Sequence, residues 1–184
     1  MTQELCLIAL EEAIQTDFEI ICDDGRRIRC SRKTLEDRWP WFKAQLSKLV
    51  EKARSALETS TLSSQERLEG SISDDDQLDH RVHARFFDLA ESYPVTLALL
   101  QYFYTLSLLT DLQQQPVVLS RLLELSTTLQ IPRLQSLAKH AMHMTLSDAT
   151  CEIYEQAARR RPGCEGLQKR CVMPFSFVLN LALN

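Results

Sequence analysis

Side chains of the kinds that bind metals are few in this chain of 184 residues. Of its four histidines, His140 and His143 stand three positions apart, a spacing that places both on one face of a helix and that metal sites use. No third ligand is expected beside them, so we interpret the pair as surface side chains. The six cysteines form no C-x-x-C pair and show no zinc-finger spacing, and we expect free thiols. No metal or other cofactor is therefore predicted.

Motifs that carry catalysis are also missing from the sequence. It contains no glycine-rich phosphate loop, no G-x-S-x-G nucleophile elbow and no H-E-x-x-H zinc motif. Asp23 and Asp24 could act as paired carboxylates, but their position before Gly25 is more typical of a turn. The run Arg159–Arg161 could attract an acidic partner or a phosphate, although basic residues at a helix end more often stabilise the helix dipole. We predict neither an enzyme nor a small-molecule substrate.

The charge balance and the apolar stretches exclude further classes. Lys and Arg number 21 against 25 Asp and Glu, a net charge of −4, whereas nucleic-acid binders usually carry a basic surplus. Glu4, Glu11 and Glu12 surround the first apolar residues, where a secretory signal has positive charge. The stretch Val172–Leu183 is shorter than the roughly 20 residues that a membrane-spanning helix needs. We predict a cytoplasmic or nuclear protein that binds neither nucleic acid nor membrane.

The first part of the chain predicts a helix, a hairpin and two further helices. Apolar residues at helical spacing predict the first helix over residues 3–15. Residues 18–22 and 26–30 alternate in polarity around Asp24-Gly25, which predicts a β-hairpin with a positive φ at Gly25. Ser31 is a candidate N-cap, and Pro40 a candidate first residue of a helix that runs to Leu49.

A polar segment interrupts the predicted domain. Residues 56–84 are rich in Ser, Thr, Gln, Glu and Asp, and we expect a flexible insertion there. Ser71 and Ser73 each precede an acid by three positions, a pattern that acid-directed kinases prefer, although an unmodified acidic loop is the commoner case. A strand over 85–89 and four helices follow, the most buried over 94–104, and regular structure is expected to end at Arg159–Gly163. These elements predict an α+β fold.

Four motifs in this order are similar to those of BTB/POZ domains. The first comprises Asp17–Ile21, Asp24-Gly25, Ile28, Leu35 and Arg38-x-Pro40-x-Phe42, with Trp39 where the family usually has Ser. The others are Leu99–Thr105, similar to the family's "LL-x-φ-φ-Y-T-G", Leu122–Leu125 with Leu129–Leu134, and Cys151–Ala157. The resemblance implies a BTB/POZ domain over residues 1–158, containing the insertion, and a C-terminal tail over 159–184. Its fold would be a small mixed sheet, a hairpin plus one strand, flanking five to six helices.

Two departures from the family pattern have consequences. Leu106 stands where the family usually has glycine, so we expect no positive φ there. The insertion is longer than the family's usual connection between the second helix and the third strand. That connection carries part of the contact with cullin-3 in adaptor members, so its length weighs against cullin binding.

The resemblance implies a protein–protein interaction module that dimerises with itself or with another BTB protein. In members with a helix before the first strand, that helix packs across the two-fold axis. The implied interface residues are Leu7, Leu10, Ile14, Leu35 and Trp39. Alternatively, the helix only covers its own core. Since no second module follows the domain, the chain resembles the stand-alone BTB proteins of filamentous fungi, unless it is part of a longer protein.

The resemblance also implies a substrate adaptor, or a competitor, for a cullin-3 ubiquitin ligase. By position the contact residues are Tyr102, Tyr104, Leu129 and Gln130, since tyrosines suit interface anchors, but both tyrosines could equally be core residues. The family's apolar-x-Glu element is either Leu49-Val50-Glu51 or Leu89-Ala90-Glu91. The alternative function is an oligomerising structural or transcription-linked scaffold that does not bind cullin-3.

Overall fold

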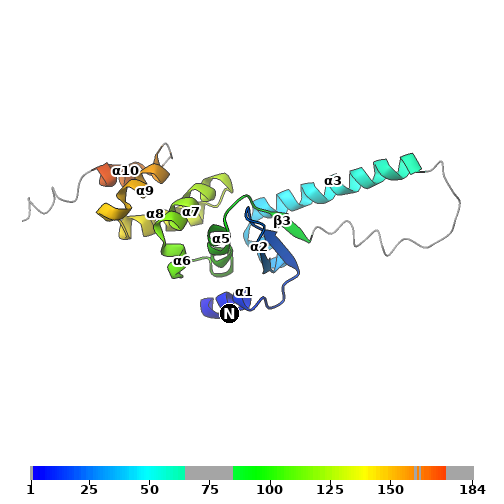
Figure 1. The fold of residues 1–184 in the computed structure, drawn as a ribbon, viewed down its shortest axis with the longest axis horizontal. Coiled ribbons are helices and arrows are strands. Elements are labelled where there is room, and N and C mark those ends of the chain that lie inside the picture. Colours follow the sequence, from blue (N-terminus) through cyan, green and yellow to red (C-terminus); the bar gives the residue numbers. More distant parts are fainter. Residues whose placement is uncertain (1, 65–84, 160, 162, 173–184) are drawn as a thin grey trace, which may run out of the picture.

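The structure, a computed structural model, describes residues 2–64, 85–159, 161 and 163–172. Within these residues the chain has an α+β fold of nine helices and one three-stranded mixed sheet (Figure 1). In chain order the elements are α1 (Gln3–Glu11), β1 (Phe18–Ile21), β2 (Arg27–Cys30), α2 (Arg32–Arg38), α3 (Pro40–Ser64), β3 (Phe86–Asp88), α5 (Tyr93–Thr105), α6 (Asp111–Gln114), α7 (Pro116–Thr128), α8 (Pro132–Met144), α9 (Asp148–Ala158) and α10 (Glu165–Val172).

The sheet is the predicted hairpin plus one strand. Its order is β2-β1-β3, with β1 antiparallel to β2 and parallel to β3. Gly25 has a φ of +77° in the turn, and Asp24 Oδ1 accepts the backbone N–H of Arg26 at 3.0 Å. The hairpin, its positive φ and the turn role of Asp24 are therefore confirmed.

Two predicted helix starts follow the hairpin. Ser31 Oγ accepts the N–H of Thr34 at 3.4 Å and caps α2, and Pro40 is the first residue of α3. However, α3 is longer than predicted, because it continues past Leu49 to Ser64 and extends away from the rest of the fold (Figure 1). Its last turns occupy the beginning of the segment that we expected to be a flexible insertion. Residues 65–84 lie outside the described residues.

Helix α5 is buried on all sides, as its apolar residues predict. Helices α1, α2, α6 and α7 pack against it, and every residue from Ala98 to Thr105 is buried. Its C-terminal end is held by Arg38, whose Nη1 donates to the carbonyl oxygens of Phe103 and Tyr104 at 2.7 and 2.6 Å. These carbonyls would otherwise lack partners, since the last turn of a helix has no N–H groups beyond it.

The residue after α5 contradicts the expectation for Leu106. It has φ +56° and ψ +27°, a left-handed conformation, although it is not glycine. Its N–H donates to the carbonyl of Tyr102 at 2.6 Å, while Thr105 Oγ1 accepts the N–H of Ser107 at 3.2 Å. The Leu106 side chain also packs against the core. These interactions offset a conformation that costs a non-glycine residue roughly 1–2 kcal/mol.

The expectation that regular structure ends at Arg159–Gly163 is wrong. Helix α10 follows and packs against α9, with Leu167 and Cys171 buried. Four positions separate these two residues, which places them on one face of a helix. Two apolar positions among polar neighbours make too short a pattern to predict this helix from periodicity alone. The described residues consequently contain more helices than the five to six expected.

The buried side chains form two clusters that share the helices α7 and α8. The first cluster combines the sheet with α2, the start of α3, α5 and Leu134 at the start of α8, whereas the second combines the rest of α8 with α9 and α10. Along α7, Leu122 and Leu125 belong to the first cluster, and Leu119 and Leu123 to the second. Helix α7 thus has one face in each half of the core.

Candidate interaction surface

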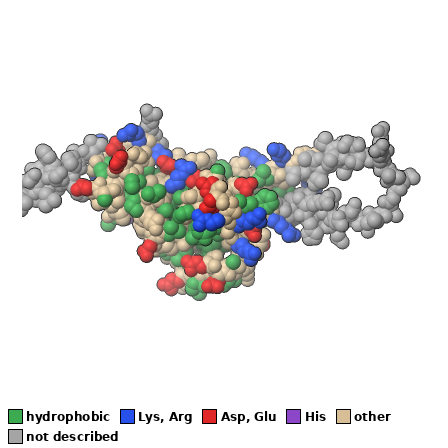
Figure 2. Space-filling view, in the orientation of Figure 1, with side chains coloured by type: hydrophobic (Ala, Val, Ile, Leu, Met, Phe, Trp, Pro, Cys, Tyr) green, Lys and Arg blue, Asp and Glu red, His purple; other side chains and the backbone are tan. Residues whose placement is uncertain are grey.

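Three large apolar side chains are exposed on or next to α1. Leu5 and Ile8 lie on the helix and Ile14 follows it, and they are 53%, 47% and 51% exposed. Leu5 and Ile8 share a helix face, because three positions separate them. At the lower edge of Figure 2, where Figure 1 places α1, hydrophobic and acidic side chains lie side by side. We call the surface of Leu5, Ile8 and Ile14 the α1 face.

The opposite side of α1 is anchored to the same chain. Helix α1 packs against α5, Leu10 is buried in the first cluster, and Gln3 Nε2 donates to Ser107 Oγ at 3.0 Å. The helix ends at Glu11, short of the predicted residue 15, because the chain then turns through Ala13 and Gln15, which have φ values of +50° and +53°. The anchored side fixes which residues of α1 remain exposed.

The five residues implied for a dimer interface lie in different environments. Leu10, Leu35 and Trp39 are only 4%, 0% and 1% exposed and belong to the chain's own core. Leu7 is half-buried, and Ile14 is exposed. In this fold the three buried residues present little surface to a partner, and Leu10 lies as the alternative that the helix covers its own core expects.

Leu5 and Ile8, which the sequence analysis did not single out, carry the exposed face instead. The available signal was the unbroken apolar run Leu5–Leu10. A helix that is apolar on all sides has more apolar surface than one core covers.

Most residues implied for a cullin-type contact also lie in the core. Tyr102, Tyr104 and Leu129 are 2%, 6% and 4% exposed, and the Tyr104 hydroxyl accepts the backbone N–H of Ser31 at 2.7 Å. Burial raises the pKa of both tyrosines. Of the four residues only Gln130, which has a φ of +56° beyond the end of α7, is exposed. The core interpretation that the sequence left open for the tyrosines describes their positions.

The two candidates for an apolar-x-Glu element differ in accessibility. Glu51 is exposed on α3, whereas Glu91 is 8% exposed in the loop between β3 and α5. The Glu91 carboxylate accepts two hydrogen bonds from Arg121, from Nε at 2.8 Å and from Nη2 at 2.7 Å. Because Glu91 is committed to an ion pair within the chain, only Leu49-Val50-Glu51 keeps its acid accessible.

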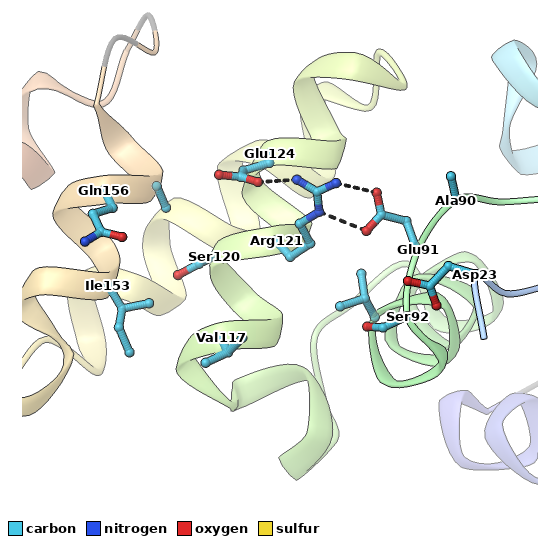
Figure 3. Close-up of a pocket in the computed structure, with 12 residues that line it drawn as sticks. Asp23, Ala90, Glu91, Ser92, Val117, Ser120, Arg121, Glu124, Ile153 and Gln156 are labelled. Carbon is cyan, nitrogen blue, oxygen red and sulfur yellow. Dashed lines mark hydrogen bonds and ion pairs between the residues drawn. The ribbon is translucent and has the colours of Figure 1, made fainter.

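Arg121 and Glu91 belong to a network of charges at the junction of the two clusters (Figure 3). Arg121 Nη1 also donates to Glu124 on the next turn of α7, and Arg161 pairs with the second oxygen of Glu124 at 3.0 Å. Burial acts to raise the pKa of Glu124, but the hydrogen bonds from Arg121 and Arg161 outweigh it, and the net shift is downward. The sequence gives no signal for this network, because only the fold brings its members together.

The structure also locates the histidine, cysteine and arginine candidates of the sequence. His143 Nδ1 lies 3.2 Å from Arg170 Nη1, and its burial and that cation lower the pKa of His143. Among the described residues no three His, Cys, Asp or Glu side chains could hold a metal ion, and all six cysteines are free. Arg159 pairs with Glu155 at 3.0 Å.

Ser71 and Ser73 lie outside the described residues. In the part of the chain that the structure describes, none of the helices has the length and apolar character needed to cross a membrane.

Sequence comparison with protein-family models and with curated proteins adds no relative from which a function could be taken. No protein-family model matches the chain, and no curated protein matches its sequence. What the protein does is therefore inferred from its own surfaces.

Proposed function

We propose that this protein is a protein–protein association module that dimerises through the α1 face. The observation that carries the proposal is the exposure of Leu5 and Ile8 on a helix whose other side is anchored by Leu10. Covering these side chains with a second copy would remove apolar surface from water, which is the main favourable term in most protein association. The acidic residues beside them would remain at the polar rim of such an interface.

The resemblance of the four motifs to BTB/POZ domains supports the same proposal. That family implies dimers in which a helix before the first strand packs at the two-fold axis, and α1 stands at that position in the chain. The sheet order and the helices that follow it are compatible with the fold that the four motifs imply. The partner is then a second copy of this chain or another BTB protein.

Within this proposal, a scaffold without cullin-3 binding is better supported than a cullin-3 adaptor or competitor. Three of the four implied contact residues are buried, and removing them would damage the core rather than a binding surface. An adaptor would have to use the exposed side chains of Gln130 and Glu51.

Light scattering coupled to size-exclusion chromatography tests the dimer. The wild-type chain should have twice the mass of the 21.2 kDa monomer. The double variant Leu5→Glu/Ile8→Glu should be monomeric with an unchanged circular dichroism spectrum. Met144→Glu is the matched control, because Met144 is 73% exposed on α8 and lies outside the α1 face. A monomeric wild type, or a double variant that still dimerises, contradicts the proposal.

Calorimetric titration with the N-terminal helical domain of cullin-3 separates the scaffold from the adaptor. We expect no binding at micromolar concentrations. Micromolar binding that Gln130→Lys abolishes would instead favour the adaptor, since Gln130 is exposed and its replacement leaves the core intact.

A further inference from the structure

A pocket of about 460 Å³ lies at the junction of the two clusters, away from the α1 face. Its walls are α7, α9, the turn between β1 and β2, and the loop between β3 and α5 (Figure 3). The backbone N–H of Asp23 in that turn donates to the carbonyl of Glu91 at 3.0 Å, which holds two of these walls together. The volume is in the range of about 300–1,000 Å³ that is typical of ligand sites.

The pocket carries an unbalanced negative charge. Asp23, Glu91 and Glu124 line it, and Arg121 is the basic residue among its lining residues. With Arg161, which pairs with Glu124, three carboxylates face two guanidinium groups and one negative charge remains. Glu91 and Glu124 are both paired with Arg121, whereas the exposed Asp23 side chain has no ion pair or hydrogen bond among the described residues. The unbalanced negative charge therefore lies at the Asp23 end of the pocket.

At the other end of the pocket, a hydroxyl that has no partner among the described residues lies next to apolar surface. Ser120 is 8% exposed, and its hydroxyl has no hydrogen-bond partner in the part of the chain that is described. Figure 3 shows this hydroxyl pointing from α7 toward α9, where Ile153 and Gln156 lie. Val117, 66% exposed, adds an apolar side chain at the same end. A buried hydroxyl is costly to leave unpaired, so this end favours a ligand that can hydrogen-bond to it.

We propose that this pocket binds a short extended peptide of a partner protein, with an apolar side chain on Val117 and Ile153 and a basic side chain beside Asp23. The peptide backbone hydrogen-bonds to the Ser120 hydroxyl and to the exposed Gln156 amide, and its Lys or Arg neutralises the Asp23 carboxylate. An anionic peptide is excluded by the same charges, because the guanidinium of Arg121 is already held by two carboxylates. This site is independent of the proposed dimer, since it shares no residue with the α1 face.

Fluorescence polarisation with the full chain tests the proposal. The probes are fluorescein-labelled pools of heptapeptides in which one position is fixed as Leu and another as Arg. Separate pools cover every spacing between the two fixed positions. Each pool is compared with a matched pool that has Glu in place of Arg. At least one Arg pool should bind tenfold or more tightly than its Glu counterpart. Asp23→Asn and Val117→Asp should each weaken that binding at least tenfold.

Asp24→Asn is the matched control, because it makes the same change one position away in a residue that pairs with Arg26 and does not line the pocket. It should leave the affinity unchanged, as should the monomeric Leu5→Glu/Ile8→Glu variant. Equal binding of Arg and Glu pools, no binding by any pool, or binding that Asp23→Asn does not weaken would overturn the proposal. Equally tight binding of argininamide alone would overturn the peptide as the occupant.

Discussion

The two halves of the core use different side chains. In the first cluster Trp39 stacks on Phe103 and Phe42 with ring centroids 4.6 and 5.4 Å apart, and Phe18 meets Phe42 edge-on at 5.5 Å. In the second cluster Tyr154 is the one aromatic residue among the buried side chains described, and the others are Leu, Ala, Met and Cys. Aromatic side chains bury about 150–250 Å² each, so the first cluster removes more apolar surface from water per residue.

This difference predicts that the part of the fold around the second cluster, the second region, opens more easily than the part around the first cluster, the first region. Small residues allow α8, α9 and α10 to approach one another closely but contribute little apolar area. Regions with few buried apolar contacts are the first to open in native proteins. Both tryptophans belong to the first region, so tryptophan fluorescence reports on that region, whereas far-UV circular dichroism reports on all helices. If the fluorescence and circular dichroism transitions occur at the same urea concentration, the two regions unfold together.

Replacing Trp39 should have the largest effect. Trp39→Ala removes a 1% exposed ring with three aromatic neighbours, and we expect a loss of about 3–5 kcal/mol in the free energy of unfolding. Urea titration followed by circular dichroism gives this value. Trp41→Ala is the control, because Trp41 is only half-buried and should cost clearly less. Equal losses in both variants would contradict the central role of Trp39.

In the second cluster, Leu167→Ala should cost less, about 2–3 kcal/mol, although Leu167 is 0% exposed. If the shared helices α7 and α8 couple the regions, the fluorescence and circular dichroism transitions should shift together in urea. A shift confined to circular dichroism would mean that α10 and its neighbours unfold as a separate unit.

The two regions also differ in how well the sequence predicts them. Three features of the first region depend on local chemistry at single positions, and the sequence predicts all three. They are the hairpin, the Ser31 cap of α2 and the start of α3 at Pro40. Helix α10 was missed, because its stability depends on packing of Leu167 and Cys171 against α9 and not on local signals. Periodicity shows that a face is apolar but not which face the rest of the chain covers.

The candidate sites were less predictable than the fold for the same reason. The resemblance implied interface roles for Trp39 and Tyr104, with a core position left open for Tyr104. A residue's exposure depends on long-range packing, and both side chains are buried. Leu5 and Ile8 carried no signal to distinguish them from Leu10 in a continuous apolar run. The pocket joins residues from Asp23 to Ala157, a combination that exists only in the folded chain.

The junction between the regions should contribute an intermediate amount. Arg121→Met leaves the 8% exposed Glu91 without its cation, and we expect a loss of about 2 kcal/mol. This is below the value for a fully buried pair because Arg121 is 45% exposed and partly screened by solvent. Arg26→Met, which breaks the exposed pair with Asp24, should change stability little. We also expect Arg121→Met to separate the fluorescence and circular dichroism transitions. If the two transitions still coincide, the packing of α7 and α8 couples the regions without this ion pair.

The same junction should weaken in acid. The pKa of Glu124 is below its ordinary value of 4.5 in the folded chain, so its stabilisation is present above about pH 4.5 and is lost as the pH falls through the folded-state pKa. Glu124→Gln should therefore lower the free energy of unfolding at pH 7, by roughly 1 kcal/mol for a partly exposed ion pair. The difference from wild type should shrink in urea titrations between pH 5 and about pH 3. A difference that stays constant over this range would exclude the Glu124 charge as its cause.

The smallest effect concerns Leu106, in the first region, where packing and backbone conformation oppose each other. Leu106→Ala loses the packing of a half-buried side chain and keeps the left-handed strain, whereas Leu106→Gly loses the packing and relieves the strain. The glycine variant should thus be more stable than the alanine variant by about 1 kcal/mol, and within a few tenths of a kcal/mol of wild type. At Ala44, exposed within α3, Ala44→Gly should have the opposite sign and cost about 1 kcal/mol. Thermal unfolding of the three variants measures both differences. If Leu106→Gly is less stable than Leu106→Ala, Leu106 is not held in a left-handed conformation in solution.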